Sequence, residues 1–349
     1  MSFDQSTPID VAAIIRYIEQ LVNTPSPTGF TKYVEQYLLD HAKQLRIPCT
    51  QTKKGAVVYS FERPAAKRNV MFAAHVDTLG AMVKSVQGGV VKIANVGSWP
   101  AIYGIGDYCK IHTFDGTVYD ATMLPDNPSV HVNKKWGEER VKIEDLHLRI
   151  DHHFSKPEEV EKAIPVGSYV SFDSHFPSIN GYVKTRHLDD KASAAILLAF
   201  ADLLRTSDAA MLPDVSIHLY FNITEETGQG IAAYPKEIDD LLIVDMGALG
   251  DGLQGDEYSV SICAKDSSGP YHYGFTHELV ALCQANEIPF KVDVFPFYAS
   301  DGSAALTAGG DHRVALIGPG IAASHGYERT HQDALANTMR LLVAYVNSI

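Results

Sequence analysis

The chain has 349 residues, of which 46% are hydrophobic and 20% charged, a composition typical of a soluble globular protein with one large or two modest domains. Its net charge of −13 disfavours a nucleic-acid partner, because phosphate backbones are bound by basic surfaces. The cysteines form no CxxC pair, and the start, MSFDQSTPID, lacks the basic and apolar regions of a signal peptide, so we expect a cytoplasmic protein with reduced thiols and no membrane partner.

The first part of the chain predicts two helices followed by two strands. Apolar residues recur at helical spacing over 9–22 and again over 31–45, and the sequence Ser-Pro-Thr-Gly between them breaks the period. Apolar runs at 56–61 and 69–76 then predict the strands.

The pattern changes between 85 and 178. Short alternating runs are separated by Gly, Pro and Asp turns there, which predicts an all-β module of the small-barrel type. After 181 the α/β pattern returns, with a helix at 190–204, strands at 215–223 and 241–245, and a closing helix at 333–346. We therefore predict an α/β domain built from 1–84 and 179–349. Its inserted β module, 85–178, is expected to shape assembly more than chemistry.

Histidines and carboxylates follow several of the apolar runs, as they would at the carboxyl edge of a parallel sheet. His75 and Asp77 end one run and leave its same face, so Asp77 is placed to accept a hydrogen bond from the His75 ring. The alternative is a buried histidine beside a turn aspartate. Asp189 opens a helix, and it is either an N-cap or a carboxylate that bridges two metal ions. We choose Asp189 over Asp190 as the candidate ligand.

Two adjacent glutamates, Glu225 and Glu226, end another apolar strand. They would repel each other in a dry site unless a cation held one of them. If Glu226 binds a metal, Glu225 is left free to act as the general base towards water. A solvated turn is the alternative.

Asp245 and His325 complete the candidate set, and His331 is the rival of His325. Histidines and carboxylates without cysteine suit zinc, cobalt or manganese in a catalytic site rather than a structural one. The sequence contains no GxSxG elbow, Walker loop or HExxH motif, which weakens the serine-hydrolase, NTPase and zincin alternatives.

These residues, in this order, resemble the glutamyl, deblocking and tetrahedral aminopeptidases of metallopeptidase family forty-two. The resemblance rests on the segments AAHVDTLGAMV, RHLDDKAS, ITEETGQG, LIVDMG and ASHGYERTH, and it covers nearly the whole chain. It implies an α/β/α sandwich with a mixed sheet and an inserted small β-barrel. It also implies a homo-oligomer, in this family often of twelve subunits.

The resemblance further implies two divalent metal ions per chain, with zinc as the first choice and cobalt or manganese as alternatives. The roles carried over are His75 and Asp245 on one ion, Glu226 and His325 on the other, Asp189 bridging both, Glu225 as general base, and Asp77 orienting His75.

The chain departs from the family where HGYERTH replaces H-S-P-x-E. A narrower branch of the family is similar at this segment and at two others, DTLGAMV and DSSGPYHY. Its members are hydrolases encoded with the osmoprotectant system that makes N-acetylglutaminylglutamine amide. We expect an aminopeptidase that removes N-terminal residues from short peptides through a metal-bridging hydroxide. The alternatives are a metal-dependent amidase or deacylase for a small modified dipeptide, and a non-catalytic cage or binding subunit.

Overall fold

The computed structural model describes residues 9–135, 137–138, 140–206, 214–234 and 237–349. Most of the N-terminal segment on which the signal-peptide expectation rests lies outside these residues. No helix within them is both long enough and apolar enough to cross a membrane.

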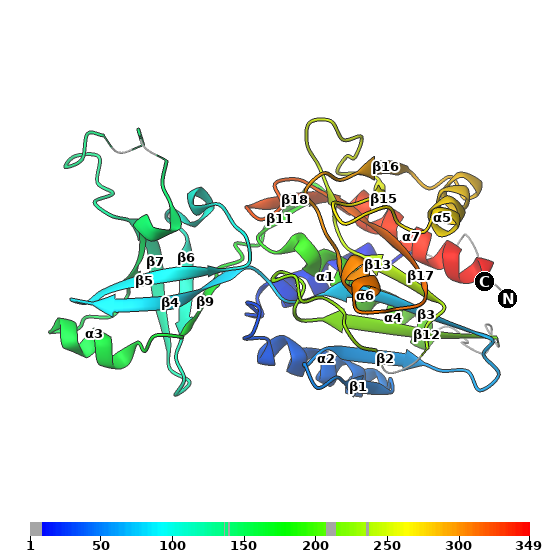
Figure 1. Ribbon diagram of the computed structural model, residues 1–349, viewed down its shortest axis with the longest axis horizontal. Coiled ribbons are helices and arrows are strands. Elements are labelled where there is room, and N and C mark those ends of the chain that lie inside the picture. Colours follow the sequence, from blue (N-terminus) through cyan, green and yellow to red (C-terminus); the bar gives the residue numbers. More distant parts are fainter. Residues whose placement is uncertain (1–8, 136, 139, 207–213, 235–236) are drawn as a thin grey trace.

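A mixed sheet of nine strands forms the centre of the larger part of the molecule (Figure 1). Its order is β1-β2-β12-β3-β13-β17-β15-β16, and β14 pairs with β17. The four central strands run parallel to one another, with antiparallel neighbours on either side. The bounds are β1 (Cys49–Gln51), β2 (Val57–Phe61), β3 (Arg68–His75), β12 (Val215–Asn222), β13 (Asp240–Val244), β14 (Gly247–Ala248), β15 (Val260–Lys265), β16 (Phe290–Val294) and β17 (Arg313–Ile321).

The central strands are buried on both faces, which explains why they read as continuous apolar runs rather than as alternating ones. In β3 every residue from Val70 to His75 is buried, and all of β12 and β13 is buried too. A polar side chain at the end of such a strand therefore has no solvent around it and needs a partner.

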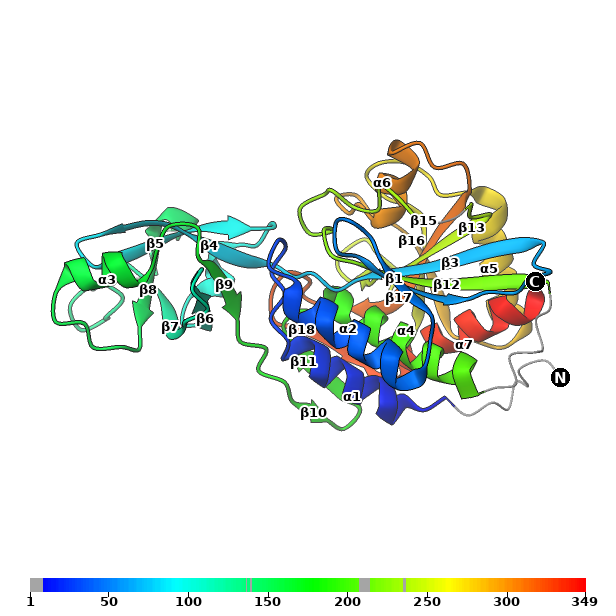
Figure 2. The same ribbon diagram turned by 90° about the horizontal axis from the view of Figure 1, so that it is seen from below.

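Helices cover one face of the sheet thickly and the other thinly (Figure 2). The main core lies between the sheet and the helices α1 (Val11–Val22), α2 (Lys32–Leu45), α4 (Leu188–Thr206), α5 (Tyr273–Ala285) and α7 (Gln332–Ser348). The opposite face is covered by α6 (Asp301–Thr307) and by loops that bury Ile231 and Phe295. The predicted α/β/α sandwich with a mixed sheet is confirmed, with layers of unequal thickness.

The inserted module is a closed antiparallel barrel that projects from the sheet domain (Figures 1 and 2). Alternate residues point inward, so Cys109 and Ile111 are buried while Tyr108 and Lys110 are exposed. This alternation gives the barrel a core of its own. The strands, in closing order, are β4 (Gly80–Gln87), β5 (Val90–Val96), β8 (Leu146–Ile150), β7 (Val118–Pro125), β6 (Tyr108–His112) and β9 (Tyr169–Phe172).

Shorter elements complete the fold. A three-stranded sheet of β10 (Ser178–Ile179), β11 (Tyr182–Thr185) and β18 (Glu328–His331) lies close to the connections between barrel and sheet domain. The barrel part also contains α3 (Pro157–Ala163) and the 3₁₀ turns η1 (Ala101–Gly104) and η2 (Ile143–Asp145). The division into 1–84 with 179–349 and 85–178 as separate folding units stays a prediction.

Candidate active site

The parallel strands deliver the candidate residues to one edge of the sheet. β3 ends at His75, β13 ends one residue before Asp245, and β12 ends three residues before Glu225. β17 ends at Ile321, and the turn that follows it carries His325. Because β12, β3, β13 and β17 are neighbours with the same direction, their carboxyl ends meet at one place.

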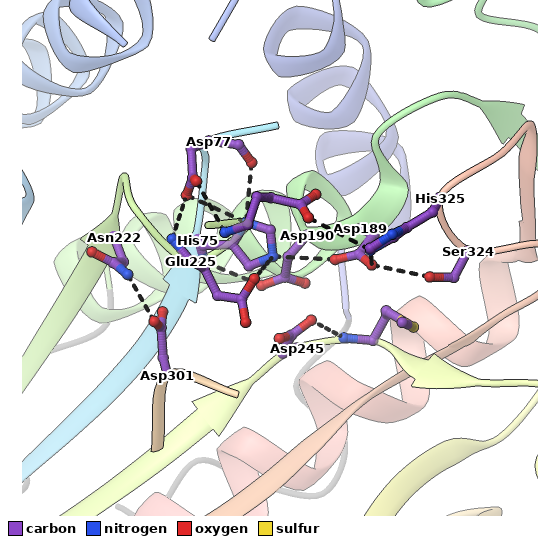
Figure 3. Close-up of polar contacts among 12 residues, drawn as sticks. His75, Asp77, Asp189, Asp190, Asn222, Glu225, Asp245, Asp301, Ser324 and His325 are labelled. Carbon is purple, nitrogen blue, oxygen red and sulfur yellow. Dashed lines mark hydrogen bonds and ion pairs between the residues drawn. The ribbon is translucent and has the colours of Figure 1, made fainter. Parts of the chain in front are cut away.

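Asp189 lies between the two histidines (Figure 3). Its Oδ1 is 3.1 Å from Nε2 of His75, and its Oδ2 is 3.6 Å from Nε2 of His325. The hydroxyl of Ser324 also donates to Oδ2, at 3.2 Å. The carboxylate of Asp189 faces the two histidines and Ser324 rather than the first backbone N–H groups of α4, which an N-cap side chain would contact.

Asp77 makes contacts in two directions. Its backbone carbonyl accepts a hydrogen bond from Nδ1 of His75 at 3.0 Å, which leaves Nε2 of the ring facing Asp189. Its carboxylate lies 3.6 Å from the same Nδ1 and accepts from the backbone N–H groups of Glu225 and Glu226, at 3.1 and 3.2 Å. Asp77 thus holds both the histidine ring and the turn that carries the glutamate pair.

The two glutamates face different histidines. Oε2 of Glu225 is 3.7 Å from Nε2 of His75, and Oε2 of Glu226 is 3.5 Å from Nε2 of His325. The side chain of Glu225 is 16% exposed, whereas that of Glu226 is only 3% exposed. Glu225 is therefore the glutamate that solvent and a substrate can reach more easily.

Two groups of side chains have the spacing that a metal ion requires. Ligand atoms of His75, Asp190 and Asp245 lie within 4.8 Å of one another, and so do those of His75, Asp189 and Glu226. Asp190 enters the site as well as Asp189, since its Oδ2 accepts from the backbone N–H of His75 at 3.2 Å. The structure therefore brings together His75, Asp77, Asp189, Glu225, Glu226, Asp245 and His325, and it adds Asp190.

The electrostatics of this cluster fit bound cations. Burial raises the pKa of Glu225, Glu226 and Asp190 well above the usual range and that of Asp245 to about 6, because buried carboxylates resist ionisation. Burial acts the same way on Asp189, but the hydrogen bond and charge of His75 lower its pKa overall. Oδ1 of Asp190 and Oε1 of Glu226 are buried and have no hydrogen-bond partner among the described residues. Carboxylates outnumber histidines, so divalent cations would compensate the charge.

Comparison with known proteins identifies the family of this chain. Residues 55–341 match the model of the M42 glutamyl aminopeptidase family. The chain belongs to this family. It is also 42% identical over 343 residues to "Putative aminopeptidase YhfE" of Bacillus subtilis (strain 168), a match that spans 97% of this chain and 98% of that protein. This M42 member is accordingly a metal-dependent aminopeptidase, and its family implies divalent metal ions.

Solved structures agree with the fold of this M42 protein. It matches the TET aminopeptidase of Thaumarchaeota archaeon SCGC AB-539-E09 with a TM-score of 0.86 at 17% identity, over 97% of both chains. It matches the Pyrococcus horikoshii TET1 peptidase with a TM-score of 0.84 at 19% identity, over 95% of this chain and 99% of that one. At such identities the likeness concerns the fold alone.

The structure separates His325 from its rival His331. The ring of His331 packs against Tyr182 and Tyr258, and its Nδ1 accepts from the backbone N–H of Asp333 at the start of α7. Its side chain caps a helix, whereas His325 faces Asp189 and Glu226.

Two buried carboxylates at the site were not singled out from the sequence. Glu328 accepts from the backbone N–H groups of Asp189 and His325, each at 3.0 Å. Asp301, at the start of α6, accepts from the side chain of Asn222 at 2.7 Å. Glu328 could have been suspected from the sequence only because it lies three residues after the candidate ligand His325. Asp301 could not, because the helix that it begins, α6, was not predicted.

Proposed function

We propose that the protein is a dinuclear aminopeptidase whose two ions share Asp189. His75 and Asp245 would hold one ion, and Glu226 and His325 the other. The observation that carries this assignment is that the two oxygens of Asp189 face different histidines, at 3.1 and 3.6 Å. A carboxylate placed in this way is suited to bridging. Asp190 would support the first ion through His75, whose backbone it already contacts.

Bound ions would polarise the scissile carbonyl and make an attacking water more acidic. Glu225 would accept the proton of that water and later deliver it to the leaving amine. Three features support this role: its raised pKa, its greater exposure than Glu226, and the Asp77 carboxylate that fixes its backbone. Zinc is our first choice of metal, with cobalt or manganese as alternatives, because all donors are imidazole or carboxylate.

The proposed substrates are short peptides with a free α-amine. The free α-amine would bind one of the ions or a nearby carboxylate, which an acylated N-terminus cannot do in the same way. We therefore expect hydrolysis of aminoacyl-anilides and dipeptides in the presence of zinc, cobalt or manganese, and little turnover of N-acetylated or amidated dipeptides. Assays of both substrate classes with each metal give the ratio of kcat/KM for the substrates with a free amine to that for the N-acetylated or amidated dipeptides. A preference for the acylated or amidated dipeptides would instead support the amidase alternative.

A homo-oligomer is proposed as the working form. Pyrococcus horikoshii TET1 peptidase, which shares this fold, can assemble into a tetrahedron or a large octahedral shell. A dodecamer of this chain would be the corresponding assembly, and light scattering measures its size.

The assignment of His325 predicts a change in metal content. His325→Ala should lose about one of the two ions, because Glu226 and Asp189 alone leave the second ion with few protein ligands. His331→Ala is the matched control and should keep both ions, since its ring caps α7. Elemental analysis after dialysis measures both variants. If His325→Ala keeps both ions and His331→Ala loses one, then His331 is the metal ligand and His325 is not.

A further inference from the structure

One segment of the inserted barrel, residues 97–107, lies against the turn that carries His325. The backbone carbonyl of Ser98 accepts a hydrogen bond from Nδ1 of His325 at 2.5 Å, so Nε2 of that ring is the nitrogen that faces Asp189 and Glu226. A Cβ atom added to the next residue, Gly326, would lie 2.8–3.0 Å from the ring of Tyr103. The turn is therefore packed directly on the barrel segment.

His325 needs such support. Its φ is 65°, in the left-handed region that residues other than glycine adopt at an energetic cost. Its ring is 32% exposed, so burial alone does not hold it. Glu328 fixes the backbone N–H of His325, and the Ser98 carbonyl fixes its ring.

A buried carboxylate of the same barrel segment, Asp107, contacts two residues of the sheet domain. Asp107 is 2% exposed, and its Oδ1 accepts from the hydroxyl of Tyr327 at 2.5 Å. Its Oδ2 pairs with Nε of Arg186 at 2.8 Å, and Arg186 is also 2% exposed. The guanidinium of Arg186 lies 4.4 Å from the ring centroid of Tyr327 and donates to the carbonyl of Tyr103.

The sequence positions of these partners give the contact its significance. Tyr327 follows His325 by two residues, and Arg186 precedes Asp189 by three. Asp107 therefore connects the barrel to the two segments that carry the proposed bridging ligand and the proposed ligand of the second ion. Removing one partner of a buried ion pair leaves the other charge without compensation, so a change at Asp107 is expected to disturb both segments.

We propose that the barrel segment 97–107 positions the second metal ligand, with Asp107 and Tyr327 as positioning residues for His325. This proposal rests on the proposed function, in which His325 binds an ion. It gives the insert a part in the chemistry, in addition to the expected part in assembly. Neither residue belongs to the proposed ligand set; both would act through the turn at 325–327.

The test is a metal titration of the full-length, metal-free protein with cobalt, followed by the visible absorption of the bound cobalt. Tyr327→Phe keeps the ring over Arg186 and removes only the hydroxyl, and Asp107→Asn removes the charge. Contacts around metal ligands typically contribute 10–100-fold in metal affinity. We expect the weaker-bound ion to lose affinity ~10-fold in Tyr327→Phe and ~100-fold in Asp107→Asn, with the first ion unchanged. Activity of Tyr327→Phe should return at saturating cobalt.

The matched control is Tyr258→Phe. Tyr258 and Tyr327 are each 44% exposed, but the hydroxyl of Tyr258 bonds to Tyr182 and not to the barrel. This control should bind both ions as the unmodified protein does. If Tyr327→Phe and Asp107→Asn bind both ions normally while His325→Ala loses one, the positioning proposal is wrong and the ligand set stands. If His325→Ala keeps both ions, the ligand assignment itself fails. Equal weakening of both ions, together with a lower melting temperature, would indicate a general structural role and would also overturn the proposal.

Discussion

Glu225→Gln should lower kcat by ~10²–10⁴-fold while leaving both metal ions bound. The substitution keeps the size of the side chain and its hydrogen-bonding capacity but removes the basic oxygen that would accept the proton of water. The backbone hydrogen bond from Glu225 to Asp77 is unaffected, so the turn should keep its shape. The measurement is kcat at saturating metal, together with the metal content of the purified variant.

Glu226→Gln is the matched comparison for this result. Its carboxylate faces His325 at 3.5 Å and is almost completely buried, so we expect it to weaken one ion first and to lose activity as a consequence. Adding excess metal should restore part of the activity of Glu226→Gln and none of that of Glu225→Gln. Near-normal turnover of Glu225→Gln, beside a Glu226→Gln variant that is inactive with both ions bound, would mean that the two roles are exchanged.

The metal-free protein should become less stable towards unfolding as the pH rises from about 4 to about 7. Burial raises the pKa of Asp245 to about 6 and that of Asp301 to about 7, whereas both titrate near 4 in the unfolded chain. The folded state then binds more protons than the unfolded state across this interval, so the free energy of unfolding falls with increasing pH. Each unit of pKa shift corresponds to about 1.4 kcal/mol.

Most other groups of the cluster whose pKa is shifted act in the same direction, and Asp189 acts in the opposite one. The pKa values of Glu225 and Glu226 are raised by burial, and that of His75 is raised because its carboxylate neighbours outweigh its burial. Only Asp189 within this cluster shifts downward, and the stability that it contributes is present above pH 4. We therefore expect the free energy of unfolding of the metal-free protein to fall by an amount on the order of several kcal/mol between acidic and neutral pH.

Urea unfolding of the metal-free protein at pH 5 and pH 7.5 measures this effect. Adding zinc should stabilise the protein far more at pH 7.5 than at pH 5, because the ions replace the protons of the carboxylates. Asp301→Asn is the control, and the metal-free variant should lose less stability between the two pH values. Greater stability of the metal-free protein at pH 7.5 than at pH 5 would contradict the assigned shifts.

The sequence by itself determined which residues stand at the ends of the buried strands. Continuous apolar runs that end at His75, before Glu225 and at Asp245 can be recognised because a central parallel strand is buried on both faces and must stop abruptly at its functional edge. The alternating runs of the barrel were equally readable, since one face of each strand points inward. Local periodicity therefore sufficed to predict an α/β domain with an inserted β module and to pick out candidate residues at strand ends, whereas the α/β/α sandwich with a mixed sheet was implied by the family resemblance.

Only the tertiary structure decided how these residues meet. Local pattern could not show that Asp190 joins Asp189 in the site, since a helix start offers both side chains equally. It could not reveal the contact between Ser98 and His325, which are 227 positions apart, or the pairing of Asp107 with both Arg186 and Tyr327. These contacts depend on how the barrel packs against the sheet domain. That placement is set by packing and buried charge between distant segments, for which no short stretch of sequence has a periodic signal.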